Sequence, residues 1–318
     1  MTAADVKLKT FTRRVKAMAS FLEVGIVHDD EFKANTLLDA CFVLAEKLIR
    51  PINAWDRDSE LARVNSAAGI KPVSVSAELF GLLLRSKKIC ALTQGMFDIT
   101  FASIDKVWYF DQPMTTLPDE KRIRASVEKI NFESLILDSK NQSAFITQKG
   151  TKVELGAIGK GYVVNHLKKF LLSHGINNAV VNAGGDLCAW GNNEYGNTWK
   201  IGVIDPSDTQ KTIGFLQVRD TAIATSGDYE KYAFVNGKRY SHIIHPKTGW
   251  PVAGIKSVTI IYPDAELADA LATSVFLLGV EEGLRLLNSI EHAAGFIIDD
   301  SNVFHYSENM KQKNFISS

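Results

Sequence analysis

The densest group of residues that could do chemistry lies in the segment VELGAIGKG, residues 153–161. It holds three glycines, one acid (Glu154) and one lysine (Lys160) where a strand pattern gives way to a helix pattern. Glycines let a backbone approach a ligand closely, and the N–H groups at the start of a helix attract phosphate. The spacing matches neither GxGxxG nor a P-loop. The segment therefore predicts a phosphate contact, with a tight turn and a surface lysine as the alternative.

A second candidate is an acid inside an apolar helix pattern, AELADALATSVFLLG at 265–279. Asp269 and Thr273 are four residues apart, so a helix places them on one face. Burying an unpaired carboxylate is costly, and a hard cation would offset that cost. Mg²⁺ takes one or two carboxylates and completes its shell with substrate phosphate oxygens and water. The pattern indicates a Mg²⁺ site, and the alternative is a capping or surface ion-pair role for Asp269.

Two glycine-containing segments bring further polar groups to predicted turns. VNAGGDLCAWG (181–191) ends an apolar strand in adjacent glycines followed by Asp186, a pattern that is more often a bulge or turn than a ligand loop. ATSGDYEKY (224–232) crowds hydroxyl, backbone N–H and carboxylate groups into one turn, which can line a polar pocket. Asp228 in this second turn is a candidate cofactor contact, and an ordinary Asx-type turn is the alternative.

The segment YSHIIHPKTGWP, residues 240–251, holds two of the seven histidines, His242 and His245. A histidine near phosphate chemistry can act as a general base toward an attacking hydroxyl, because its ordinary pKa lies near neutrality. A structural, hydrogen-bonded histidine is the alternative. We interpret His242 as the candidate base and leave the role of His245 open.

Hydrophobic periodicity predicts the elements that must hold these residues. Strand patterns outnumber helix patterns and often follow one another directly, which favours an α+β fold with a largely antiparallel sheet flanked by helices. No repeat or linker divides the chain, so we expect one domain over 1–318. The expected helices are 31–50 (ended by Pro51), 76–93, 119–130, 160–173, 266–277 and 280–290, and the expected strands are 20–27, two within 135–148, 177–182, 199–204, 215–218, 257–262 and 294–298.

Composition excludes several classes of partner. The 318 residues include 36 Lys+Arg and 36 Asp+Glu, a balance that argues against nucleic acid as the main ligand. The three cysteines are scattered without a CxxC pair, so we interpret them as buried side chains rather than disulfides or metal ligands. No signal peptide or membrane-spanning run occurs, which predicts a cytoplasmic protein. A periplasmic, membrane-anchored protein whose leader had been removed would look the same.

Six motifs in order, spread over most of the chain, resemble the ApbE family of Mg²⁺-dependent FAD:protein FMN transferases. They are TQGMFDIT (93–100), VELGAIGKGY (153–162), VVNAGGD (180–186), ATSGDYE (224–230), SHIIHPKTGWPV (241–252) and ADALATSVFLLG (268–279). The resemblance runs from about residue 18 to about 298 and implies a T-fold-related domain with its core at about 18–300. It implies that FMN passes from FAD to a Thr or Ser hydroxyl of a target protein, as a phosphoester, with release of AMP.

The resemblance also assigns individual residues. His242 would be the base, and Asp269 would act in catalysis as the side-chain carboxylate on the metal. The implied Mg²⁺ ligands are the main-chain carbonyl of Ala157 and the side chains of Asp269 and Thr273. The expected FAD contacts, with Asp228 from the turn described above, are Met18, Ser59, Met96, Phe97, Asp98, Glu154, Lys160, Asp228 and Ile243.

The chain departs from the family pattern at several of these positions. Met18-Ala19-Ser20 replaces Met-Gly-Thr, Glu154 replaces Asp, and both Asn165 and His245 replace Asp. Two other functions therefore stay open: a Mg²⁺-dependent FAD pyrophosphatase that releases FMN and AMP, and a non-catalytic flavin-binding protein. The sequence leaves the identity of the target protein and the formation of a homodimer undecided.

Overall fold

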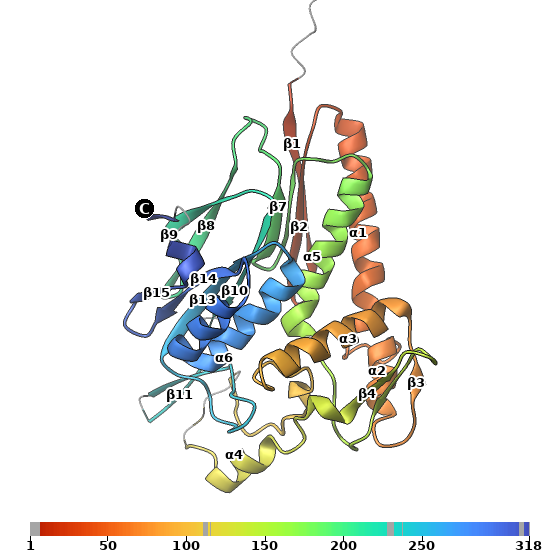
Figure 1. The fold of residues 1–318 in the computed structure, drawn as a ribbon, viewed down its shortest axis with the longest axis vertical. Coiled ribbons are helices and arrows are strands. Elements are labelled where there is room, and N and C mark those ends of the chain that lie inside the picture. The colour runs from red at the N-terminus through yellow and green to blue at the C-terminus, as the bar shows by residue number, and fades with distance from the viewer. Residues whose placement is uncertain are drawn as a thin grey trace, which may run out of the picture.

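The computed structural model describes residues 7–110, 114, 116–227, 232–236, 238–311 and 315–317. Its centre is an eight-stranded sheet in the order β1-β2-β6-β7-β10-β13-β14-β15 (Figure 1). Every pairing between these strands is antiparallel, which confirms the α+β prediction. The strands are β1 (Lys9–Ala17), β2 (Ser20–His28), β6 (Ala179–Ala183), β7 (Asp186–Trp190), β10 (Thr221–Gly227), β13 (Ile255–Tyr262), β14 (Ala294–Asp299) and β15 (Phe304–Tyr306).

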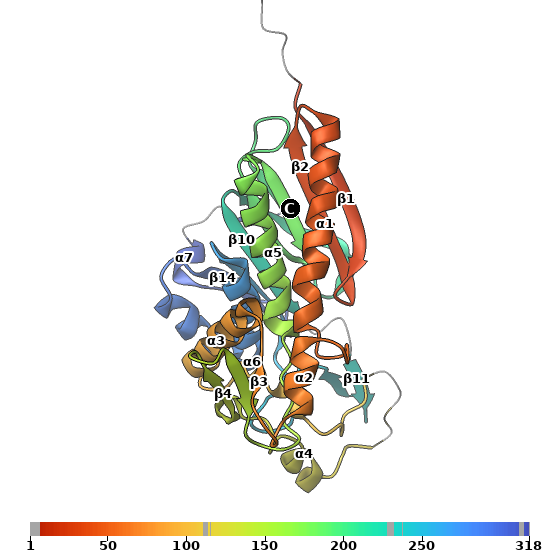
Figure 2. The ribbon, with the colours of Figure 1, turned by 90° about the vertical axis from the view of Figure 1, so that its right-hand side faces the viewer.

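Three long helices cover one face of this sheet (Figure 2): α1 (Glu31–Ile52), α5 (Gly156–Ser173) and α6 (Ala265–Ser289). Successive side chains of a strand point to opposite faces, so every second residue meets the helices. Leu22, Val24 and Ile26 of β2 are buried in the core that contains α1 and α5. Val258 and Ile260 of β13 are buried in the core that contains α6. This packing fixes α5 and α6 on the same side of the sheet.

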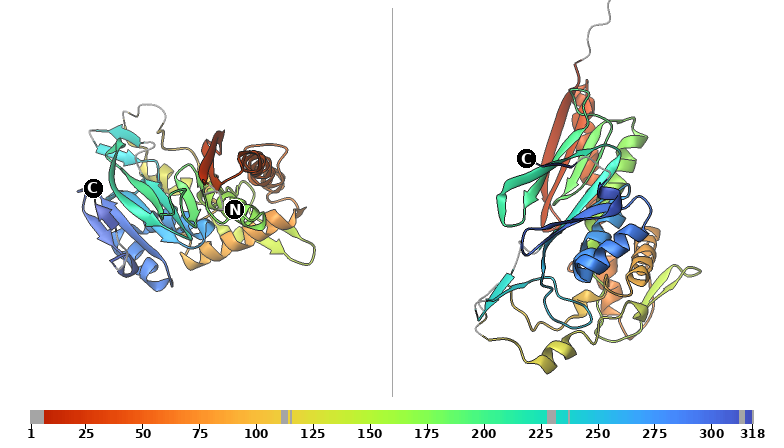
Figure 3. Two further views of the ribbon diagram at one scale, coloured as in Figure 1. Left: turned by 90° about the horizontal axis from the view of Figure 1, so that it is seen from above. Right: turned by 60° about the vertical axis from the view of Figure 1, so that its left-hand side comes forward.

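A smaller sheet covers the opposite face of the large one (Figure 3). Its strands, in the order β16-β9-β8, are β16 (Phe315–Ser317), β9 (Asp208–Val218) and β8 (Trp199–Asp205). Leu187 and Ala189 of β7 face this second core, while Cys188 and Trp190 of the same strand face the helices. Both faces of β7 are therefore buried, which explains its continuous apolar sequence after Asp186.

Short elements gather beyond the end of the large sheet at which α5 begins (Figure 1). They carry the loop of residues 93–100 and the segment around His242. These elements are α2 (Glu60–Ser66), β3 (Val73–Ser74), α3 (Ala77–Leu92), η1 (Phe101–Ser103), α4 (Glu120–Ser126), η2 (Phe132–Ser134), β4 (Leu135–Asp138), β5 (Ser143–Ile146), β11 (Tyr232–Val235) and β12 (Lys238–Ser241); α7 (Glu308–Lys311) lies near the C-terminus.

Several predicted boundaries were wrong. Helix α5 begins at Gly156 and not at Lys160, so Lys160 lies in its second turn. Helix α1 continues through Pro51 to Ile52: the proline has no N–H for the carbonyl four residues earlier, but it lies in the last turn and interrupts no later turn of the helix. Strands β1, β7 and β10 and helix α2 lie where no regular element was predicted. Residues 224–227, predicted as part of a turn, belong to β10, and α4 is shorter than 119–130. The predicted break between 277 and 280 is confirmed by Gly279, whose φ of 84° interrupts α6.

All three cysteines are buried and reduced, as the composition predicted. Burial raises the pKa of Cys41 and of Cys90 to about 12, so neither thiol ionises near neutral pH. Across the described part of the chain, no helix has the length and the hydropathy that a membrane crossing needs.

Candidate functional site

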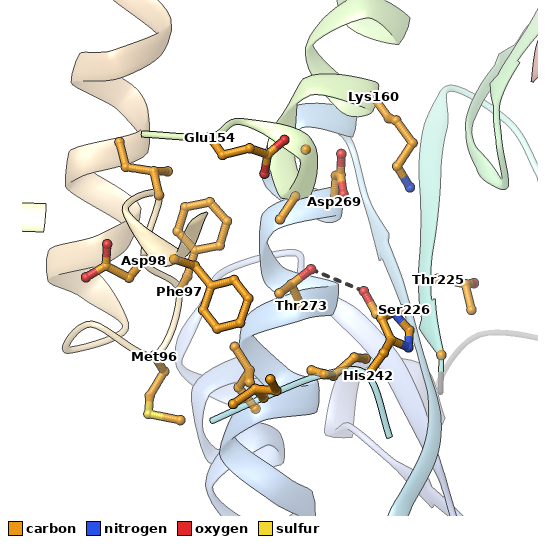
Figure 4. Close-up of a pocket in the computed structure, with 18 residues that line it drawn as sticks. Met96, Phe97, Asp98, Glu154, Lys160, Thr225, Ser226, His242, Asp269 and Thr273 are labelled. Atoms are coloured by element: carbon orange, nitrogen blue, oxygen red, sulfur yellow. Dashed lines mark hydrogen bonds between the residues drawn. The ribbon is translucent and has the colours of Figure 1, made fainter. Parts of the chain in front are cut away.

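A cavity of about 290 Å³ lies where the first turns of α5, the last residues of β10, helix α6 and the segment after β12 meet (Figure 4). Thirteen positions were proposed for the site from the sequence: ten of them line the cavity, Met18 and Ser59 do not, and Asp228 lies outside the described residues. The lining residues are Met96, Phe97, Asp98, Ile99, Phe101, Glu154, Gly156, Ala157, Lys160, Thr225, Ser226, Gly227, His242, Ile243, Ile244, Asp269, Thr273 and Leu277.

Close contact between α5 and α6 places Asp269 beside the first turns of α5. A Cβ atom on Gly161 would lie 2.1 Å from the carbonyl oxygen of Ala265, so only glycine allows this approach. The Gly161 N–H donates to Asp269 Oδ2 at 3.1 Å. Asn165 adds a second connection, because its side-chain oxygen accepts a hydrogen bond from the N–H of Ala265 at 2.9 Å. The glycine at 161 therefore serves the contact between the two helices.

Asp269 is 3 % exposed, and its surroundings favour the protonated form. Burial is the main cause, and the neighbouring carboxylate of Asp186 adds to it; together they raise the pKa of Asp269 to about 8. Lys160 and the Gly161 N–H oppose this rise by stabilising the carboxylate. A nearby positive charge would therefore stabilise the ionised form of Asp269.

Lys160 supplies positive charge beside Asp269 and forms an ion pair with Asp186. Asp186 opens β7 and is 2 % exposed. Its Oδ1 accepts a hydrogen bond from the Thr225 N–H at 3.3 Å. Burial raises the pKa of Asp186, while Lys160 and Thr225 counteract the rise. No role was predicted for Asp186 from the sequence. Its position immediately after a pair of glycines was the one sequence feature that could have indicated a site residue.

Thr273 lies one helical turn after Asp269, and both side chains reach the cavity from α6, as their spacing predicted. The Thr273 hydroxyl is 3.3 Å from the hydroxyl of Ser226 at the end of β10. Within the described residues, no cluster of three or more His, Cys, Asp or Glu side chains could hold a metal. The donors fit a cation that accepts few protein oxygens and retains phosphate and water ligands, as Mg²⁺ does.

Glu154 is held at the cavity by hydrogen bonds to its own backbone and that of its neighbour. The Asn65 side chain bonds both the N–H and the carbonyl of Val153 at 2.8 Å, and the Glu154 N–H donates to the Ile99 carbonyl at 2.7 Å. Burial raises the pKa of Glu154, and the N–H of Gly156 partly opposes the shift. Asn65, which does not line the cavity, therefore positions Glu154 through the backbone of Val153.

The loop of Met96, Phe97 and Asp98 forms a second wall. The Asp98 carboxylate accepts hydrogen bonds from the Thr100 N–H at 2.7 Å, from the Thr100 hydroxyl at 2.6 Å and from the Phe132 N–H at 3.1 Å. Figure 4 shows this carboxylate turned away from the other labelled polar side chains. Asp98 thus stabilises the loop that presents Phe97, and both of its carboxylate oxygens accept hydrogen bonds within that region.

His242 and Ile243 follow β12 directly, and both line the cavity. The Ile243 N–H donates to the Ser241 hydroxyl at 3.0 Å, and its carbonyl accepts from the Val252 N–H at 2.8 Å. His245 does not line the cavity. Its Nδ1 accepts a hydrogen bond from the Lys247 N–H at 3.2 Å, and burial lowers its pKa, so it stabilises a turn.

Two expected contacts, Met18 and Ser59, do not line the cavity. Met18 forms the turn between β1 and β2 with a φ of 51°, and its Cε would be 3.6 Å from a Cβ on Gly159. Ser59 is 2 % exposed and caps α2: its hydroxyl accepts from the Ala62 N–H at 2.9 Å and donates to the Asn53 carbonyl at 2.7 Å. Asp228 lies outside the described residues.

Comparison with known proteins gives consistent results at the level of family and fold. The ApbE family profile matches residues 16–297. An FAD:protein FMN transferase of Klebsiella pneumoniae is 31 % identical over 297 residues, covering 91 % of this chain and 84 % of its own. One from Treponema pallidum is 31 % identical over 288 residues, covering 85 % and 79 %.

Solved structures resemble the chain over nearly its whole length. The crystal structure of the ApbE protein from Thermotoga maritima has a TM-score of 0.85 at 28 % identity, covering 96 % of this chain and 99 % of that one. The flavin transferase ApbE from Vibrio cholerae has a TM-score of 0.84 at 26 % identity, covering 96 % and 100 %.

Proposed function

The chain belongs to the ApbE family, and we propose that it is a Mg²⁺-dependent transferase that moves FMN from FAD to a Thr or Ser hydroxyl of a target protein. The observation that carries the proposal is the cavity itself. It brings a buried carboxyl (Asp269), a hydroxyl (Thr273), an ammonium group (Lys160) and an imidazole (His242) together from three different parts of the chain. These are the groups that a reaction at a pyrophosphate needs.

In the proposed reaction, the acceptor oxygen forms a bond to the phosphorus of the FMN half. The bond from that phosphorus to the bridging oxygen breaks, and the oxygen leaves with AMP. His242 accepts the proton of the acceptor hydroxyl, so atoms and charge balance. The product is a phosphoester between FMN and the target protein.

Helix α5 and Lys160 hold the phosphate oxygens in this proposal. The N-cap residue of α5, Leu155, makes no side-chain cap, and Gly156 and Ala157 line the cavity. The first N–H groups of a helix lack partners within the helix, so an anion at this end satisfies them. Lys160, one turn further on, adds a positive charge on a flexible stem.

Asp269, Thr273 and the carbonyl of Ala157 are the groups that would hold Mg²⁺. In a regular α-helix the Gly161 N–H donates to the Ala157 carbonyl; here it donates to Asp269 Oδ2 at 3.1 Å. Bound Mg²⁺ would neutralise the charge that develops on the pyrophosphate as the bond to AMP lengthens. Burial and the Asp186 carboxylate raise the pKa of Asp269, so a cation at this position would stabilise its ionised form.

The test incubates the protein with FAD, Mg²⁺ and a candidate acceptor protein, then measures flavin fluorescence on the denatured acceptor and AMP in solution. Equal amounts of acceptor-bound FMN and AMP are the expected result. Free FMN with AMP and no labelled acceptor would identify a pyrophosphatase instead. Tight FAD binding without AMP would identify a non-catalytic flavin-binding protein.

The metal assignment has its own variant. Asp269→Asn keeps the size of the side chain but removes the carboxylate, so Mg²⁺-dependent release of AMP should stop. Asp299→Asn is a matched control, since Asp299 forms an ion pair with His305 at 2.8 Å on β15 and does not line the cavity. Activity of Asp269→Asn close to that of the unmodified protein would reject the assignment.

A further inference from the structure

Asp186 connects three elements of the site without lining the cavity. It lies at the start of β7, and its side chain contacts Lys160 of α5 and the Thr225 N–H of β10. Its carboxylate also neighbours that of Asp269 on α6. Asp186 is buried and is not among the residues that line the cavity, so a ligand there does not contact it directly. Any influence of this acid on a substrate must therefore pass through a neighbouring side chain.

Lys160 is the neighbour that both contacts Asp186 and lines the cavity. A lysine carries its charge on four rotatable carbons, so an unrestrained ammonium group samples many positions. Here the ion pair with Asp186 restrains the ammonium group. The Cδ of Lys160 would lie 3.7 Å from a Cβ on Gly184, so the stem passes close to the glycine turn before β7.

The ion pair with Asp186 leaves the Lys160 ammonium group able to bind a phosphate as well. An ammonium group has three N–H donors, so a bond to Asp186 is compatible with further bonds to phosphate oxygens. Asp186 is itself held by the Thr225 N–H, next to Ser226 in the cavity wall. The ion pair therefore ties the lysine to the end of β10 and defines one position for its charge relative to α6.

We propose that Asp186 is a positioning residue that holds the Lys160 ammonium group where it contacts the pyrophosphate of FAD. The proposal rests on the proposed function for the identity of the ligand. It assigns Asp186 no contact with the substrate and no role as a metal ligand. Its effect on FAD should therefore depend on the presence of the lysine.

A double-mutant cycle tests this dependence, with the dissociation constant for FAD measured by flavin fluorescence in EDTA. Asp186→Asn keeps the shape and the acceptor for the Thr225 N–H but removes the charge. We expect it to weaken FAD binding about 10-fold, whereas in a Lys160→Met background the same change should alter the constant less than 2-fold. Asp299→Asn, which removes a carboxylate from another ion pair, should leave the constant unchanged.

An equal loss of affinity in both backgrounds would overturn the proposal, because Asp186 would then act on the fold and not through the lysine. Unchanged affinity of Asp186→Asn would overturn it too. If Asp186→Asn alone does not fold, Lys160→Met is compared with the double variant, since both lack the ammonium group through which Asp186 is proposed to act: a difference of more than about 2-fold overturns the proposal, and a smaller one is the expected result. The measurement needs no acceptor and no turnover, so it can fail while the transferase assay succeeds, or the reverse.

Discussion

The contact between α5 and α6 at Gly161 makes a demanding prediction. In Gly161→Ala, the new Cβ would lie 2.1 Å from the Ala265 carbonyl oxygen, 2.5 Å from the Ala265 carbonyl carbon and 2.7 Å from the Cα of Glu266. All three are backbone atoms, so no side chain can rotate away. Non-bonded heavy atoms prefer separations of about 3.5 Å, so the helices must move apart by about 1 Å or more.

Two consequences follow from a displacement of this size. Overpacking of a buried contact costs about 1–3 kcal/mol of unfolding free energy, and the Ala265 carbonyl leaves little room to relax. The 3.1 Å bond from the Gly161 N–H to Asp269 would also stretch beyond hydrogen-bonding distance. Because an error of about 1 Å in a catalytic group can cost about 10²-fold in rate, AMP release should fall by that order.

Gly159→Ala provides a matched control two residues earlier in the same helix. Its Cβ would meet Ile52 Cδ1 at 3.4 Å and Met18 Cε at 3.6 Å, which are ordinary contacts with side chains. Alanine is favoured over glycine inside a helix by up to about 1 kcal/mol. Urea unfolding should therefore show Gly159→Ala as stable as the unmodified protein or slightly more so, with AMP release retained.

The result that refutes this reasoning is a Gly161→Ala protein with unchanged urea midpoint and unchanged activity. Equal losses in Gly159→Ala and Gly161→Ala would also refute it. Glycine would then be needed at both positions for a local reason, and not at Gly161 for the approach of α6.

Three other predictions concern separate residues of the site. His242→Ala should slow FMN transfer by about 10² to 10⁴-fold while FAD affinity, measured by fluorescence titration, stays near its original value; a collapse of FAD binding would make the residue structural. Asn65→Ala removes the partners of two backbone groups of the buried Val153, so urea unfolding should show a loss of about 2–4 kcal/mol, and a loss below about 0.5 kcal/mol would contradict this role. The pKa of Asp269 is raised from 3.8 to about 8, so between these pH values the folded, metal-free protein retains a proton that the unfolded chain has released. The contribution of this group to the free energy of unfolding therefore falls as pH rises from about 4 to about 8, and in EDTA Asp269→Asn should gain stability relative to the unmodified protein from pH 6 to pH 8; a constant difference would contradict the assignment.

Much of the site could be predicted because its residues sit in short segments with strong local patterns. Asp269 and Thr273 share a helix face by spacing alone, and Gly279 marked the break in α6. The start of α5 could not be predicted in the same way. The glycines of 156–161 have the composition of a turn, whereas the structure places them in the first turns of α5, where Gly161 allows the close contact with Ala265.

Residues that position others were the least visible in the sequence. Asp186 and Asn65 act on Lys160 and Val153, which are 26 and 88 residues away along the chain. Ser59 resembled a ligand contact, but a serine in that place equally caps a helix, and the structure shows the cap. Strand β1 was missed because an edge strand carries charged residues that obscure its alternation.

The types of chemical groups, the family resemblance and the helix face that carries Asp269 and Thr273 could be predicted, because they depend on residue identity and on spacing within one element. Which of these groups meet depends on how the elements pack. The approach of α5 to α6 brings Asp269 to the Gly161 N–H, and the sheet brings Asp186 to Lys160. Distances between elements follow from packing and burial, which no local pattern specifies.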